Sequence, residues 1–105
     1  MTPEARTRDM AQIFRALGDP SRLAIFELVR ECCGDDSAVS TDNLRNSVSE
    51  IAGRFDLSLS TVSHHLKELR TAGLIRCERH GQHILCSVDT EVLADVEHFL
   101  RGAPL

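Results

Sequence analysis

The strongest constraint on the fold is a pair of short apolar patterns that stand side by side in residues 48–73. In the first pattern the apolar residues recur at positions i, i+3, i+4 and i+7: Val48, Ile51, Ala52 and Phe55. In the second they recur at positions i, i+4 and i+7: Val62, Leu66 and Leu69. Both spacings are those of one face of an α-helix. The residues between the patterns, 57–59, leave room only for a turn.

The second apolar pattern is bounded by helix-capping residues. Ser58 is a suitable N-cap because its hydroxyl can accept a hydrogen bond from an amide of the first turn. Gly73 follows the last apolar position, where a left-handed cap is expected. Two helices joined this tightly form the angled helix-turn-helix pair, which places its second helix in the major groove of DNA. We therefore predict a helix-turn-helix over about residues 47–73.

Two more helices before this motif, a hairpin and a last helix complete the predicted fold. Apolar periodicity predicts helices over about residues 5–17, 21–33 and 90–101, with a polar connection over 34–46. Apolar residues alternate with period 2 over residues 74–88 around a Gly81-Gln82 turn, which predicts a β-hairpin. The fold class is thus mainly α with a small β-hairpin: a winged helix-turn-helix of about five helices and a two-stranded wing, in one domain over residues 1–105.

The first and last helices, about 5–17 and 90–101, carry apolar stripes beyond what a compact winged core needs. The simplest use for this surface is a homodimer with two-fold symmetry. The alternative is that both helices close the core of a monomer.

Composition narrows the class of protein further. The chain has 105 residues, of which 42% are hydrophobic, and no run of 18 apolar residues that would span a membrane. Its first residues lack the apolar core of a signal peptide, so we expect a cytoplasmic protein whose cysteines are reduced thiols. The net charge is −4, but residues 60–83 hold four Lys and Arg against two Glu. This window is a modest positive footprint on an acidic body, or else an ordinary solvated helix face.

Three stretches of the chain resemble the ArsR/SmtB family of transcriptional regulators. They are ALGDPSRLAIFELV (Ala16–Val29), LSLSTVSHHLKELRTAGLI (Leu57–Ile75) and the hairpin tip Arg79–Gln82. The resemblance covers nearly the whole chain. It implies a homodimeric repressor that binds double-stranded DNA of dyad symmetry and is released by a metal ion, a metalloid or a thiol-reactive signal.

The exposed side of the predicted second helix supplies most of the candidate DNA contacts. Hydroxyls and imidazoles near its start would approach base edges, and the cations farther along would contact phosphates. Ser58 at the electropositive helix end suits a phosphate, and the hairpin tip would reach the backbone or the minor groove. The candidate residues are Ser58, Ser60, Thr61, Ser63, His64, His65, Lys67, Arg70, Arg79, His80 and Gln82.

The chain departs from the family at the sensor site. Many members that sense metalloids or cadmium carry Cys-x-Cys where this chain has Ser47-Val48-Ser49, and a serine hydroxyl is not the soft thiolate ligand that such ions need. A second family site on the last helix has here only one histidine, His98, among acidic residues, which makes a weak zinc or nickel candidate.

The remaining candidates for metal or thiol sensing are two cysteine pairs, Cys32 with Cys33 and Cys77 with Cys86. A two-residue turn at 81–82 would make Cys77 and Cys86 direct cross-strand neighbours. The pairs could bind a soft metal or metalloid ion, react with an oxidant, or pack as small apolar residues with no cofactor at all.

Other classes of function fit the sequence less well. No combination of nucleophile, base and open metal site is present, so we predict that the chain is not an enzyme. A regulator of the same family with no metal site, controlled by redox chemistry or by a partner protein, remains an alternative. A winged helix that binds proteins rather than DNA is a second alternative, which the acidic net charge would suit.

Overall fold

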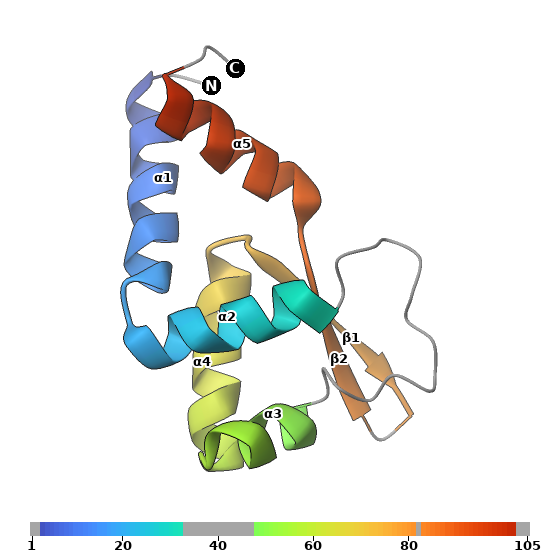
Figure 1. Cartoon of the computed structure of the whole chain (residues 1–105). Coiled ribbons are helices and arrows are strands. Elements are labelled where there is room, and N and C mark those ends of the chain that lie inside the picture. The colour runs from blue at the N-terminus through green and yellow to red at the C-terminus, as the bar shows by residue number, and fades with distance from the viewer. Residues whose placement is uncertain (1–2, 33–47, 82, 103–105) are drawn as a thin grey trace.

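The computed structural model describes residues 3–32, 48–81 and 83–102. Within these residues it has the predicted helices and hairpin (Figure 1). Their bounds are α1 (Pro3–Leu17), α2 (Pro20–Cys32), α3 (Val48–Phe55), α4 (Leu59–Thr71), β1 (Ile75–His80), β2 (His83–Val88) and α5 (Thr90–Arg101). The predicted winged helix-turn-helix is confirmed. The predicted connection over 34–46 lies outside the described residues, as do Cys33 and Gln82.

Side-chain caps explain where α2 and α5 begin. The Asp19 carboxylate accepts a hydrogen bond from the backbone amide of Arg22 at 3.0 Å, and Pro20 takes the first helical position, where no amide is needed. This backbone bond is the main reason why the pKa of Asp19 lies below its usual value. At α5, Asp89 accepts from the amides of residues 91 and 92, and Gly102 closes the helix with φ +75°.

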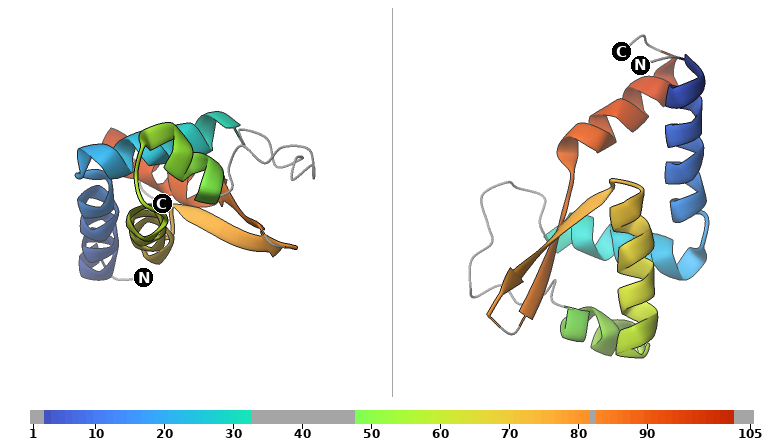
Figure 2. Two further views of the ribbon diagram at one scale, coloured as in Figure 1. Left: turned by 90° about the horizontal axis from the view of Figure 1, so that it is seen from below. Right: turned by 180° about the vertical axis from the view of Figure 1, so that it is seen from behind.

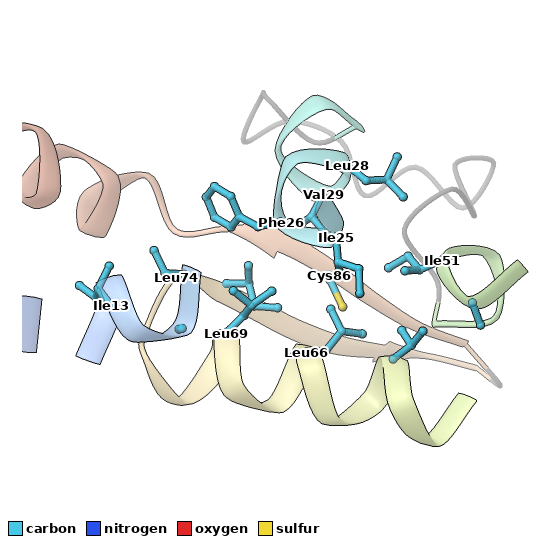
Figure 3. Close-up of a cluster of buried hydrophobic side chains, with 14 of the residues drawn as sticks. Ile13, Ile25, Phe26, Leu28, Val29, Ile51, Leu66, Leu69, Leu74 and Cys86 are labelled. Atoms are coloured by element: carbon cyan, nitrogen blue, oxygen red, sulfur yellow. The ribbon is translucent and has the colours of Figure 1, made fainter. Parts of the chain in front are cut away.

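The core forms where α2 lies across α4 and the hairpin (Figure 1). Helix α2 contacts α1, α4 and β2, so it is the central helix that its broad apolar face predicts. The predicted inward residues of α4, Val62, Leu66 and Leu69, are all buried. Figure 3 shows Leu66 and Leu69 facing the side chains of α2, with the Cys86 sulfur of β2 in the same cluster.

The hairpin has the register that the predicted two-residue turn requires. Cys77 pairs with Cys86 and His80 with His83, and Gly81 in the turn has φ +63°. Strand β1 contacts α4, whereas β2 contacts α2 and α3. The wing is therefore packed against the helix-turn-helix along its base.

Helix α5 lies farther from the core than any other helix. None of its residues is fully buried, although one face packs on the core, and the Phe99 ring lies 6.1 Å from that of Phe14 in α1. The end of α5 approaches the start of α1 at one end of the molecule (Figures 1 and 2), where Arg6 lies over the Phe99 ring. Leu100 on α5 is 67% exposed. No helix in the described part of the chain is long and apolar enough to cross a bilayer.

Candidate nucleic-acid interface

The N-terminus of α4 is organised by the hydroxyl of Ser58. This hydroxyl accepts a hydrogen bond from the Thr61 amide at 3.1 Å and donates one to Thr61 Oγ1 at 2.8 Å. Ser60 Oγ lies 3.1 Å from Ser58 Oγ, so three hydroxyls form one exposed cluster. The first turn carries no acidic residue, and the positive end of the helix dipole is therefore not neutralised there. Such an end attracts phosphate oxygens.

Most candidate contacts on α4 lie on its solvent side. The exposed residues are Ser58, Ser60, Thr61, Ser63, His64, Lys67 and Arg70. The opposite face of α4 carries the apolar stripe described above, which packs into the core. The helix therefore presents a continuous polar surface to solvent.

His65 does not lie on that solvent side, where the sequence analysis placed it. Its side chain is only 9% exposed, and Nδ1 accepts a hydrogen bond from Arg22 Nε at 3.4 Å. Arg22 also donates to the Ala16 carbonyl at 3.3 Å, so this contact links α4 to α2 and the end of α1. The physical reason is helical spacing: position 65 is three residues after Val62 and four before Leu69, on their buried face.

The hairpin brings further cations to the same end of the molecule as the start of α4. In Figures 1 and 2 the strand ends, α3 and the N-terminus of α4 lie together, away from α5. Arg79 is exposed, and its Nε donates to the Gly81 carbonyl at 3.3 Å. The backbone of His80 ends β1, but its side chain, like Gln82, lies outside what the structure describes. Arg76, nearer the base, pairs with Asp89 at 3.3 Å.

Comparisons with known proteins agree with this geometry. A family model described as a helix-turn-helix domain matches residues 17–78. The transcriptional repressor SdpR of Bacillus subtilis is 36% identical over 86 residues, which cover 82% of either chain. The crystal structure of the ArsR family transcriptional regulator RHA00566 superposes with a TM-score of 0.70 at 28% identity, covering 97% of this chain and 89% of the other. The chain belongs to the ArsR/SmtB family of transcriptional regulators.

A further solved structure has a fold similar to that of this ArsR/SmtB regulator. Mb0332 from Mycobacterium bovis, described as a homodimeric winged helix-turn-helix DNA-binding domain, superposes with a TM-score of 0.71 at 21% identity. The match covers 96% of this chain and 84% of the other. In this fold α3 and α4 are the paired helices predicted as a helix-turn-helix, and β1 and β2 form the hairpin predicted as the wing.

Of the four cysteines of this ArsR/SmtB regulator, the structure describes the side chains of Cys77 and Cys86. The Sγ atoms of Cys77 and Cys86 lie 3.2 Å apart across the hairpin. The hydrogen bond with Cys86 lowers the pKa of Cys77 to about 7; burial opposes this, and the Arg70 guanidinium adds to it by charge and hydrogen bonding. Cys32 ends α2, but its side chain lies outside the described part, as does all of Cys33.

No metal site is apparent in the described residues of the regulator. Over 3–32, 48–81 and 83–102, no three His, Cys, Asp or Glu side chains converge as a metal ion would require. On α5, Asp89 is engaged as the N-cap and in the ion pair with Arg76.

Two features of the helix-turn-helix were missed by the sequence analysis. Leu59, the first residue of α4, is 56% exposed beside the serine cluster, although the sequence suggested only a turn residue there. Asp56 adopts φ +52°, a left-handed conformation that the turn between α3 and α4 imposes. An aspartate tolerates this conformation better than most residues, which is the only sequence signal for it.

Proposed function

We propose that this chain is a dimeric repressor that binds an operator of dyad symmetry through α4 and the wing. The observation that carries the proposal is the exposed, uncharged first turn of α4, which ends in a hydroxyl cluster and an unneutralised helix N-terminus. Such a surface can enter a groove closely and still bind phosphate at its end. The proposal assigns no catalytic step to the chain.

The proposed contacts fall into two groups. Side chains in the first two turns of α4 read base edges: Ser60, Thr61, Ser63 and His64, with Leu59 available for a thymine methyl group. Ser58, Lys67 and Arg79 bind the phosphate backbone and add affinity without sequence information, and the wing residues His80 and Gln82 complete this second group. His65 is left out because it is buried.

The proposed dimer uses the outer surfaces of α1 and α5. Phe14 and Leu100 expose apolar surface there, and a pocket of about 260 Å³ lies between α1, α5 and the end of α4. A structure of similar fold is described as homodimeric, which agrees with a dimer. Two-fold symmetry would then set the two α4 helices about 34 Å apart, one turn of B-DNA.

The signal that releases the operator is proposed to act on thiols. The serines at 47 and 49 replace the thiolate ligands of related sensors. The described residues also lack a metal-binding cluster, whereas Cys77 and Cys86 place two sulfurs in contact.

Fluorescence anisotropy with the DNA upstream of the chain's own gene tests the binding proposal. We expect that DNA to bind more tightly than random DNA of equal length, and affinity to fall steeply between about 50 and 200 mM salt. The His64→Ala variant should lose specific binding, whereas His98→Ala, which changes an exposed histidine of α5, should not. No salt-sensitive binding to either DNA would contradict the proposal and favour a protein-binding winged helix.

A further inference from the structure

The wing contains a pair of sulfur atoms already close to bonding distance. Cys77 and Cys86 occupy directly opposed positions of β1 and β2, and their Sγ atoms lie 3.2 Å apart. A disulfide bond is about 2.05 Å long, so the two sulfurs need to approach by only about 1.2 Å. Opposed residues of an antiparallel pair have Cβ atoms about 4.5–5.5 Å apart, at or above the upper limit of about 4.5 Å for a disulfide. The bond is therefore attainable with a small adjustment of the strands.

The two thiols have different environments. Cys77 is half-buried, whereas Cys86 is only 1% exposed and belongs to the hydrophobic core. The lowered pKa of Cys77, near 7, makes a substantial fraction of this thiol ionised at neutral pH. Thiolate character and access to solvent select the cysteine that reacts first with an oxidant. Cys77 is thus the attacking thiol and Cys86 the resolving one.

The surroundings of the pair favour covalent chemistry over metal binding. The Arg70 guanidinium at the end of α4 interacts with Cys77 and would repel a cation at the same sulfur. Among the described residues the site offers two sulfur ligands, and no third His, Cys, Asp or Glu side chain converges on them to complete a metal site.

We propose that Cys77 and Cys86 form a reversible disulfide across the wing in response to hydrogen peroxide, and that this disulfide weakens DNA binding. The inference rests on the proposed function for its effect on DNA. It names the oxidant and the reaction of the two thiols, which that function leaves open.

The reaction balances in two steps. The Cys77 thiolate attacks one peroxide oxygen; the S–O bond forms as the O–O bond breaks, and the departing hydroxide takes up a proton to become water. The Cys86 thiol then attacks the sulfur of the Cys77 sulfenic acid. The S–S bond forms, the S–O bond breaks, and hydroxide leaves with the Cys86 proton as a second water. The two sulfurs together lose two electrons, which reduce one molecule of peroxide.

The disulfide has two routes to the DNA-binding surface. Drawing the sulfurs together shifts β1 against α4 or moves Cys86 out of its contacts with α2, and either shift relocates Arg79 near the hairpin tip. Oxidation also removes the partial negative charge that Cys77 presents to Arg70 on α4. The first change acts on Arg79, which the proposed function places beside a phosphate, and the second acts on Arg70, a DNA contact predicted from the sequence.

Peptide mapping and DNA binding on the same peroxide-treated sample test the inference. We expect mass spectrometry under non-reducing conditions to find the Cys77 peptide joined to the Cys86 peptide. We expect the apparent Kd for the upstream DNA to rise by at least about fivefold, the lower end of usual coupling between sites. Dithiothreitol should reverse both effects.

Matched variants assign the effect to the wing. Cys77→Ala should keep its DNA affinity in peroxide, whereas the Cys32→Ser/Cys33→Ser double variant should respond as the wild type does. Cys77 is half-buried, so Cys77→Ala also avoids the risk to folding of a change at Cys86.

Three results would overturn the inference. One is the absence of a Cys77–Cys86 cross-link when the other cysteines oxidise; another is a cross-link that leaves the Kd unchanged. The third is an undiminished response of Cys77→Ala. Failure of the reduced protein to bind the upstream DNA would instead remove the proposed function and with it the effect on DNA, while peptide mapping would still decide whether the pair forms the disulfide.

Discussion

Two neighbouring histidines on α4 have opposite environments. We therefore expect one to contribute to DNA binding and the other to the stability of the fold. His64 is exposed on the polar face, whereas His65 is buried and accepts a hydrogen bond from Arg22. Their ring centroids lie 6.0 Å apart at an interplanar angle of 51°.

Alanine at each histidine should therefore produce different defects. We expect His64→Ala to weaken binding to the upstream DNA by roughly 1–3 kcal/mol and to leave thermal stability unchanged. His65→Ala should lower the free energy of unfolding by about 1–3 kcal/mol, because it removes a buried side chain and the acceptor of a part-buried hydrogen bond. Anisotropy and urea denaturation measure the two quantities. Equal losses of stability in both variants would contradict the assignment.

The Ser58 cap offers a second test at this scale. Ser58→Ala should lower the free energy of unfolding by about 1 kcal/mol, since the Thr61 amide loses its acceptor. Ser58→Asp is the matched control, because aspartate caps a helix as well as serine does. It should keep the stability in urea denaturation and lose DNA affinity, because a carboxylate at this helix end repels phosphate. Unimpaired binding by Ser58→Asp would place the phosphate elsewhere.

The sequence analysis placed His65 on the exposed side of α4 because its side chain is polar. Helical periodicity alone would have placed it on the buried side. Position 65 shares the face of Val62 and Leu69, but a polar side chain suggested a solvent position. Its burial depends on Arg22, 43 positions earlier in the chain, and no local pattern announces such a partner. The left-handed backbone at Asp56 belongs to the turn between α3 and α4, and its residue type is a weak signal for that conformation.

Among the elements, the hairpin was the one whose detail the sequence predicted best. A two-residue turn fixes the register of both strands, so locating Gly81 was sufficient to pair Cys77 with Cys86. The capping residue Ser58 located the start of α4 in the same way. Capping and turn chemistry are local, which is why these boundaries were predictable. The interaction of Arg70 with Cys77 joins α4 to β1, so no local pattern could predict it.

The hairpin also yields a pH-dependent prediction. Because the pKa of Cys77 is lowered to about 7, its thiolate and its rate of alkylation by iodoacetamide should rise through neutral pH and fall below it. Removing the hydrogen bond in Cys86→Ala should move the midpoint toward the ordinary cysteine value, and Arg70→Gln should move it in the same direction by less. Alkylation followed by mass spectrometry of the Cys77 peptide gives each profile. A wild-type midpoint near 9 would contradict the assignment.

At the scale of the whole molecule, the proposed DNA-binding surface and the proposed dimer surface lie at opposite ends. The start of α4 and the wing lie at one end, and the approach of α1 to α5 lies at the other (Figures 1 and 2). A signal in the wing would therefore act on DNA binding without passing through the proposed dimer surface.

A charge on α5 should break the proposed dimer. We expect Leu100→Glu to shift the protein toward monomer in sedimentation equilibrium, because the side chain is 67% exposed in the single chain and would be buried only by a partner. Ile84→Glu makes the same change at an exposed residue of the hairpin and should leave the oligomeric state unaltered. A wild-type protein that is monomeric at all concentrations would contradict the dimer.

Helix α5 is capped at both ends, yet none of its residues is fully buried. This feature connects the stability of the fold to the concentration of the protein. If a second copy covers that helix, dilution removes part of the hydrophobic burial that holds α5 in place, so the melting temperature should depend on protein concentration. Operator DNA, by binding the dimer, would then stabilise the fold by mass action. In a cell with few copies of this regulator, the molecules most resistant to unfolding would be those bound to DNA.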